Sequence, residues 1–97
     1  MYAVIFRAKT KQLDSSYEET AARLRTLAKE KYGCVDFVAA YEAGSEIVIS
    51  YWPSLEQIAA WKQDPEHIAA QEKGRAQWYE SFTVHVCKIE KDYGFTQ

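Results

Sequence analysis

The chain has 97 residues, of which 47% are hydrophobic and 27% charged, and a formal net charge of −2. A chain of this length forms one domain, residues 1–97, and buries only about 60–65% of its unfolded surface, so a second subunit would help stabilise it. Scattered Lys and Arg give no basic surface for nucleic acid. No apolar run approaches a membrane span, and the N-terminus has no signal-peptide pattern. Cys34 and Cys87 indicate two reduced packing thiols, so we expect a cytoplasmic protein.

The first third of the chain predicts a strand and a helix. Residues 2–9 alternate with a β-rich composition, and the centre of this strand is apolar on both faces. The following helix runs to about Tyr32, and Gly33 is well placed to end it. We expect the helix to begin at a capping box, for which two Ser-x-x-Glu pairs are available, Ser16 with Glu19 or Ser15 with Glu18.

The middle of the chain predicts a hairpin. Residues 34–43 and 46–52 have the composition of strands, and Gly44-Ser45 between them is a turn signal. The consecutive apolar residues at the centre of the second strand, Ile47-Val48-Ile49, again indicate that both of its faces are buried.

The stretch Ser50–Ser81 organises the rest of the chain, because it holds all three tryptophans and both prolines. Ser54 with Gln57 predicts a capping box at the start of a helix over residues 54–63. Asp64 followed by Pro65 is a second helix start, which breaks the helical stretch in two. Residues 82–90 then predict a last strand.

The predicted order is therefore β-α-β-β-α-β, the α+β ferredoxin-like arrangement with a four-stranded antiparallel sheet. In that fold both helices lie on one face of the sheet, and the other face lies open. The predicted strands offer apolar residues to both sides, and an apolar face of this size is too large for a stable monomer. We therefore expect a two-fold homodimer that packs sheet against sheet, with the aromatic residues of the tail 91–97 helping to hold it.

Short motifs centred on the tryptophans extend along the same stretch. They are Trp52, Ser54-Leu55-Glu56, Ala60-Trp61, Pro65-Glu66-His67, Gly74-Arg75 and Trp78-Tyr79. This pattern resembles the antibiotic biosynthesis monooxygenase family, whose domains form dimeric α/β barrels. The resemblance implies one of two chemistries, that of a cofactor-free oxygenase branch or that of a haem-degrading branch. The haem-degrading triad is absent here, because Gln71 stands ten residues after Trp61 in place of the ligating histidine and the chain has no asparagine.

The break at Asp64-Pro65 is the predicted position of a site. Trp61 and His67 flank the break, and such a corner tends to leave an opening beside aromatic walls for a small molecule. A position at a helix N-terminus disfavours protonated histidine, so His67 is the candidate proton acceptor. Candidate substrate-binding residues are Trp61, Gln71, Tyr51 and Trp78. The alternative is that the tryptophans fill the core and that His67 is a capping or surface residue.

The sequence contains none of the common nucleotide, zinc or hydrolase motifs, and we expect no metal site and no cofactor. Two functions remain open. One is a small cofactor-independent monooxygenase, an oxidoreductase acting on an aromatic or quinone-like molecule. The other is a non-catalytic dimeric module that binds a small ligand.

Overall fold

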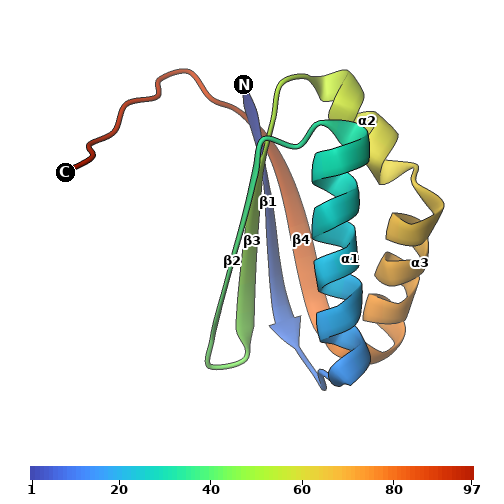
Figure 1. The fold of residues 1–97 in the computed structure, drawn as a ribbon. Helices are drawn as coiled ribbons and strands as arrows, with labels where there is room; N and C mark the ends of the chain where they lie inside the picture. Colours follow the sequence, from blue (N-terminus) through green and yellow to red (C-terminus); the bar gives the residue numbers. More distant parts are fainter.

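The computed structural model describes residues 1–97 as one sheet covered on one face by helices (Figure 1). The elements are β1 (Tyr2–Thr10), α1 (Ser15–Tyr32), β2 (Asp36–Glu42), β3 (Ser45–Trp52), α2 (Leu55–Lys62), α3 (Pro65–Lys73), the π-helix η1 (Gly74–Trp78) and β4 (Tyr79–Lys88). The four strands are antiparallel, in the order β2-β3-β1-β4. This is the predicted α+β ferredoxin-like fold. None of the helices has the length and apolar character that a membrane crossing requires.

The start of α1 differs from the prediction, because Asp14 is its N-cap rather than Ser15 or Ser16. The Asp14 carboxylate accepts the backbone N–H of Tyr17 at 3.1 Å and the hydroxyl of Ser16 at 2.6 Å. It also accepts the indole N–H of Trp78 at 3.3 Å. A carboxylate that serves three donors is a stronger acceptor than a serine hydroxyl, and here it joins the first turn of α1 to the end of η1.

The predicted break in the second helical stretch is present. The side chain of Asp64 accepts the backbone N–H of Glu66 at 2.8 Å, and Pro65 occupies the first turn of α3.

At the start of α2 the predicted capping box is only half formed. The Ser54 side chain accepts the backbone N–H of Gln57, as predicted. The Gln57 side chain accepts the Ser54 hydroxyl at 2.8 Å and donates to the carbonyl of Tyr32, so it does not bond the backbone N–H of Ser54. The Tyr32 carbonyl lies in the last turn of α1, where backbone acceptors have no partner within the helix.

Two strand boundaries lie earlier in the chain than predicted. The turn between β2 and β3 is Ala43-Gly44, one residue before the predicted pair, and its φ angles of 50° and 82° suit the left-handed positions of a tight hairpin turn. The last strand begins at Tyr79 rather than at residue 82, because η1 ends the helical segment at Trp78.

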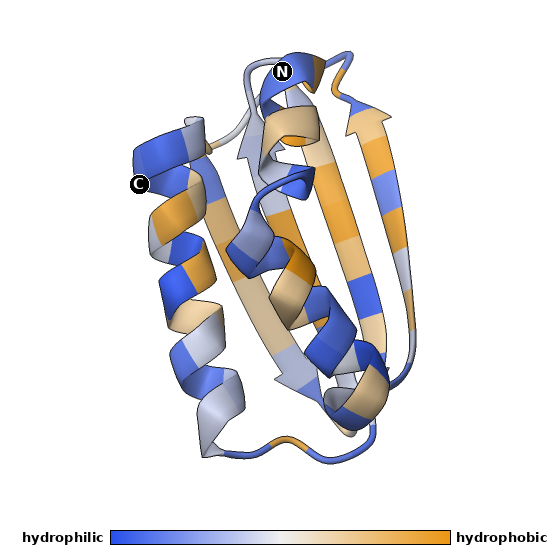
Figure 2. Ribbon diagram, turned by 90° about the vertical axis from the view of Figure 1, so that its right-hand side faces the viewer, coloured by the Kyte–Doolittle hydropathy of each residue, from blue (hydrophilic) through white to orange (hydrophobic).

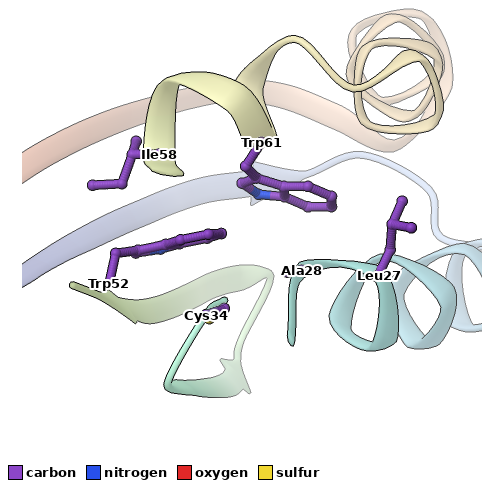
Figure 3. Close-up of a cluster of buried hydrophobic side chains, with 6 residues drawn as sticks. All are labelled: Leu27, Ala28, Cys34, Trp52, Ile58 and Trp61. Carbon is purple, nitrogen blue, oxygen red and sulfur yellow. The ribbon is translucent and has the colours of Figure 1, made fainter. Parts of the chain in front are cut away.

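The main core lies where α2 and the second half of α1 meet the sheet. It is formed by six buried residues shown in Figure 3: Leu27, Ala28, Cys34, Trp52, Ile58 and Trp61. Trp52 is fully buried, and its indole N–H donates to the hydroxyl of Ser50 at 2.8 Å. Large aromatic side chains therefore supply much of the buried surface of this small domain.

The helices cover the sheet unevenly. Figure 2, which looks onto the helical side, shows most of β4 at the right with no helix in front of it. Cross-strand pairing of Val84 with Phe6 and of Val86 with Val4 places these β4 valines on the helical side of the sheet. Val84 and Val86 nevertheless remain 46% and 50% exposed.

The face of the sheet that carries no helix is apolar along β3, as the sequence predicted for this strand. Alternation from the buried Trp52 places Tyr51, Ile49 and Ile47 on this open face, and pairing adds Val38 of β2. Ile47 is 41% exposed and Val38 is 51% exposed. In Figure 1 the C-terminal tail after β4 extends away from the sheet, with Tyr93 and Phe95 exposed. The homodimer stays a prediction.

Candidate functional site

Trp61 and His67 form a stacked pair across the break between α2 and α3. Their ring centroids lie 4.2 Å apart and the ring planes differ by 12°. The Nδ1 atom of His67 lies 3.1 Å from the carbonyl oxygen of Trp61. A carbonyl only accepts hydrogen bonds, so Nδ1 carries the proton and Nε2 is the acceptor nitrogen of the neutral ring.

The environment of His67 favours this neutral ring. Burial lowers the pKa of His67 below its ordinary value of 6.5, and the Trp61 carbonyl and the Asp64 carboxylate offset this only in part. The Nε2 atom has no hydrogen-bond partner in the protein, whereas every buried side-chain nitrogen or oxygen has one. Nε2 therefore reaches the accessible surface, where it is able to accept a proton from a bound molecule.

Trp61 itself is part of the core. It is 7% exposed, His67 covers one side of its ring, and Trp52 stacks at 6.3 Å between centroids with an interplanar angle of 29°. The ring centroid of Tyr32 lies 5.5 Å from that of Trp61. Side chains of the protein thus pack against Trp61 where the sequence predicted an opening, and the stacked ring of Trp61 holds His67 in place.

The structure brings together only some of the predicted site residues. Gln71 lies one turn after His67 on α3 and is likewise half-buried. Tyr51 lies on the open face of the sheet, on the side opposite Trp61. Trp78 is buried near the first turn of α1, at the other end of the helical layer. Trp61 and His67, with Gln71 beside them, are therefore separated from Tyr51 and Trp78.

An apolar strip beside α3 was missed by the sequence reasoning. It consists of Val84 and Val86 on the helical side of β4. On α3, Ile68 is the large apolar residue that remains exposed, at 39%. Helix α3 contributes no fully buried residue, so it does not seal this side of the sheet. The alternation of Phe82, Val84 and Val86 was visible in the sequence, but only the placement of the helices shows that these valines are left uncovered.

A second polar pair was also missed. Glu46 of β3 is 6% exposed, and its carboxylate accepts the hydroxyl of Tyr79 at 3.1 Å. Burial raises the pKa of Glu46, and burial together with the nearby carboxylate raises the pKa of Tyr79. The sequence could have indicated this pair, because Glu46 is a charged residue at the same alternate spacing as Val48, Ser50 and Trp52 on the buried side of β3. No group of three or more His, Cys, Asp or Glu side chains is arranged to hold a metal ion.

Comparison with known sequences finds a relative that matches nearly the whole of this chain. The chain is 41% identical over 97 residues to YqjZ, an uncharacterised protein of Bacillus subtilis strain 168, covering 99% of this chain and 85% of YqjZ. The chain belongs to the YqjZ family. No family model matches the sequence.

Solved structures share the fold at low sequence identity. SnoaB of Streptomyces nogalater, a cofactor-independent oxygenase, has a TM-score of 0.78 at 14% identity over 94% of each chain. Rv0793 of Mycobacterium tuberculosis has a TM-score of 0.81 at 14% identity, covering 96% of this chain and 98% of its own. A Nitrosomonas europaea protein assigned to the antibiotic biosynthesis monooxygenases has a TM-score of 0.78 at 14% identity, covering 94% and 100%. These structures confirm that the fold resembles that of the antibiotic biosynthesis monooxygenases.

Proposed function

We propose that this protein is a cofactor-independent monooxygenase of aromatic or quinone-like small molecules, with His67 as the proton acceptor. The observation that carries the proposal is the neutral imidazole of His67, whose Nδ1–H is held by the Trp61 carbonyl and whose Nε2 is free. The shared fold with SnoaB, a cofactor-independent oxygenase, supports this reaction class. Fold alone does not assign a reaction, so the proposal depends on His67.

The chemistry needs little more than a base and a binding surface. Nε2 of His67 takes the proton of a bound phenol or quinol, and the resulting anion passes an electron to O₂. One oxygen atom then enters the product and the other leaves as water. Because no external reductant takes part, the substrate itself supplies the electrons and gives up two hydrogens, as when a phenol becomes a quinone. The protein contributes deprotonation and orientation.

The uncovered strip beside α3 is the proposed place for the ring of the substrate. Val84, Val86 and Ile68 offer apolar contacts, and the amide of Gln71 on α3 offers a hydrogen bond to a substrate oxygen. Trp61 contributes the edge of its ring and fixes the position of His67. Tyr51 lies on the open face of the sheet and Trp78 lies at the other end of the helical layer, so neither takes part in this proposed site.

Both cysteines are free thiols, which supports a cytoplasmic location.

A non-catalytic module that binds a small apolar ligand is the second candidate. The observation that favours it is the burial of Trp61, which is 7% exposed and stacks with both His67 and Trp52. In this case the apolar strip beside α3 binds a ligand, and His67 is a structural residue that packs on the core at the break between α2 and α3.

Oxygen consumption with a panel of quinols and oxidisable phenols separates the two candidates. We expect His67→Ala to lower turnover by roughly 10²- to 10⁴-fold while the fold is retained, because general-base help has that size. His85→Ala, on an exposed β4 position, is the matched control and should leave turnover unchanged. Trp61→Ala should also destabilise the fold by about 3–5 kcal/mol. Equal oxygen consumption by His67→Ala and the wild type with every compound would remove His67 from the mechanism.

A further inference from the structure

A surface cavity at the start of β4 combines two aromatic side chains with one basic and one acidic residue. It measures about 280 Å³ and is lined by five residues, Arg75, Tyr79, Glu80, Ser81 and Phe82. It adjoins a second hollow of about 350 Å³, with which it shares Ser81 and Phe82. A volume near 300 Å³ is the lower limit for small-molecule sites, so the first cavity suits a single ring.

The aromatic wall of this cavity is held in place by three contacts of Tyr79. The absence of a side chain at Gly74 lets the Tyr79 ring approach, since a Cβ atom there would lie 2.8 Å from two ring carbons. The ring meets Phe82 at 6.0 Å between centroids. Its hydroxyl is bound by the buried Glu46. Tyr79 also directly follows the π-helix η1, and such irregular turns are often found at functional sites.

Arg75 brings a positive charge to this wall that is engaged in no ion pair, although Glu80 also lines the cavity. Its guanidinium carbon lies 5.4 Å from the centre of the Phe82 ring. The one ion pair of the protein joins Arg23 to Glu66, so Arg75 is not paired with Glu80 although both line the cavity. No side-chain hydrogen bond occupies Arg75 either, which leaves the whole planar fork of N–H donors available.

We propose that this cavity binds the carboxylate end of an aromatic ligand, with Arg75 as the partner of the carboxylate and with Tyr79 and Phe82 against the ring. A guanidinium beside two aromatic side chains matches a planar aromatic acid, because its donors pair with both carboxylate oxygens while the ring contacts the aromatic wall. The inference rests on the proposed function only for the aromatic nature of the ligand. It narrows the proposed substrates to aromatic acids whose ring system extends from Phe82 to Val84, which lie two residues apart on the same side of β4.

Titration of the ¹⁵N-labelled full chain with benzoate tests this site without any turnover. We expect saturable shifts of the backbone amides of Arg75 and of residues 79–82. The neutral isostere benzamide should bind at least about tenfold more weakly, because it loses the charge-assisted pair. Saturable shifts confined to other residues, or equal affinity for benzamide, would overturn the proposal.

Variants of Arg75 give the second arm of the experiment. Arg75→Gln should weaken benzoate binding by about ten- to a hundredfold, and Arg75→Lys, which keeps the charge but loses the planar fork, should weaken it less. Arg25→Gln is the matched control, since Arg25 lies over the ring of Phe37 at 5.5 Å on another part of the surface. Wild-type affinity in Arg75→Gln would refute the assignment. Benzoate binding, together with no oxygen consumption on any quinol or phenol of the panel, would leave this site standing and reject the monooxygenase.

Discussion

The hydroxyl of Tyr79 and the carboxylate of Glu46 are hydrogen-bonded at 3.1 Å, although Tyr79 begins β4, Glu46 lies in β3, and β1 runs between these two strands. The β1 residue between them is Ala8, which pairs with Glu46 on one side and with Phe82 on the other. Its small side chain leaves room for the tyrosine to reach across. One buried hydrogen bond therefore ties the irregular turn before β4 to the centre of the sheet.

This bond leads to a prediction about stability and pH. Burial raises the folded-state pKa of Glu46 above its unfolded value, so its contribution to stability is full below the unfolded pKa and is lost as the pH rises through the folded one. Glu46→Gln keeps an acceptor for Tyr79 but does not ionise. We expect the wild type to lose stability relative to Glu46→Gln as the pH rises from about 4 to about 8, measured by urea unfolding.

The matched control is Glu42→Gln, which changes an exposed carboxylate on the neighbouring strand β2. Its stability difference from the wild type should stay nearly constant over the same range. A difference between the wild type and Glu46→Gln that does not depend on pH would show that the Glu46 carboxyl titrates alike in the folded and unfolded states.

The second prediction concerns the protonation of His67. Burial lowers the folded-state pKa of His67 below the ordinary value. The contribution of His67 to stability is therefore present above the unfolded pKa of about 6.5 and is lost as the pH falls through the folded pKa. We expect the ring-proton NMR signals of His67 to titrate below 6.5, with His67→Ala used to assign them. Titration at or above that value would contradict the lowered pKa of His67 and would remove this support for His67 as the proposed base.

The third prediction is a homodimer formed through the open face of the sheet. The apolar residues exposed there include Ile47 and Val38, and burying such a face stabilises a small domain. Sedimentation at micromolar concentration should give about twice the chain mass of 11.2 kDa. Ile47→Glu should shift the mass toward the monomer, because it would place a charge within the apolar contact.

Leu55→Glu is the control for this experiment, since Leu55 is 50% exposed but lies on α2, on the helical side. It should leave the mass unchanged. Removal of the residues after Lys91, with Tyr93 and Phe95, should weaken association. A wild-type mass near that of one chain at micromolar concentration would contradict the dimer, and unchanged association after truncation would exclude a role for the tail.

The fourth prediction is that haem is neither bound stoichiometrically nor degraded. Gln71 stands at the position of the haem ligand in the haem-degrading branch of the family that the sequence resembles. His67, the nearest histidine, has its Nδ1 bound to the Trp61 carbonyl and its ring stacked on Trp61. Haemin titration should therefore give no sharp Soret band at one equivalent. A stoichiometric band that is bleached on addition of a reductant would contradict this prediction.

The sequence by itself determined the order of the elements, the end of α1 at Gly33 and the break between α2 and α3. Asp64-Pro65 and Gly33 specify local backbone states, because an N-cap carboxylate, a proline ring and a left-handed glycine each restrict the chain within a few residues. The alternation of apolar residues determined the faces of the strands in the same way. These features depend on neighbours in the chain, so they can be predicted without a fold.

Only the tertiary structure decided which side chains meet. Asp14 replaces the expected serines as the cap of α1 because its carboxylate also reaches Trp78, 64 residues away. The contact of Glu46 with Tyr79 spans 33 residues, and it depends on strand order and on the small side chain of Ala8 between them. The same packing buries Trp61 against His67 and Trp52. It leaves the valines of β4 uncovered, because the helices lie over the other strands (Figure 2). Contacts between distant segments depend on how the layers pack, and the local sequence pattern does not specify that packing.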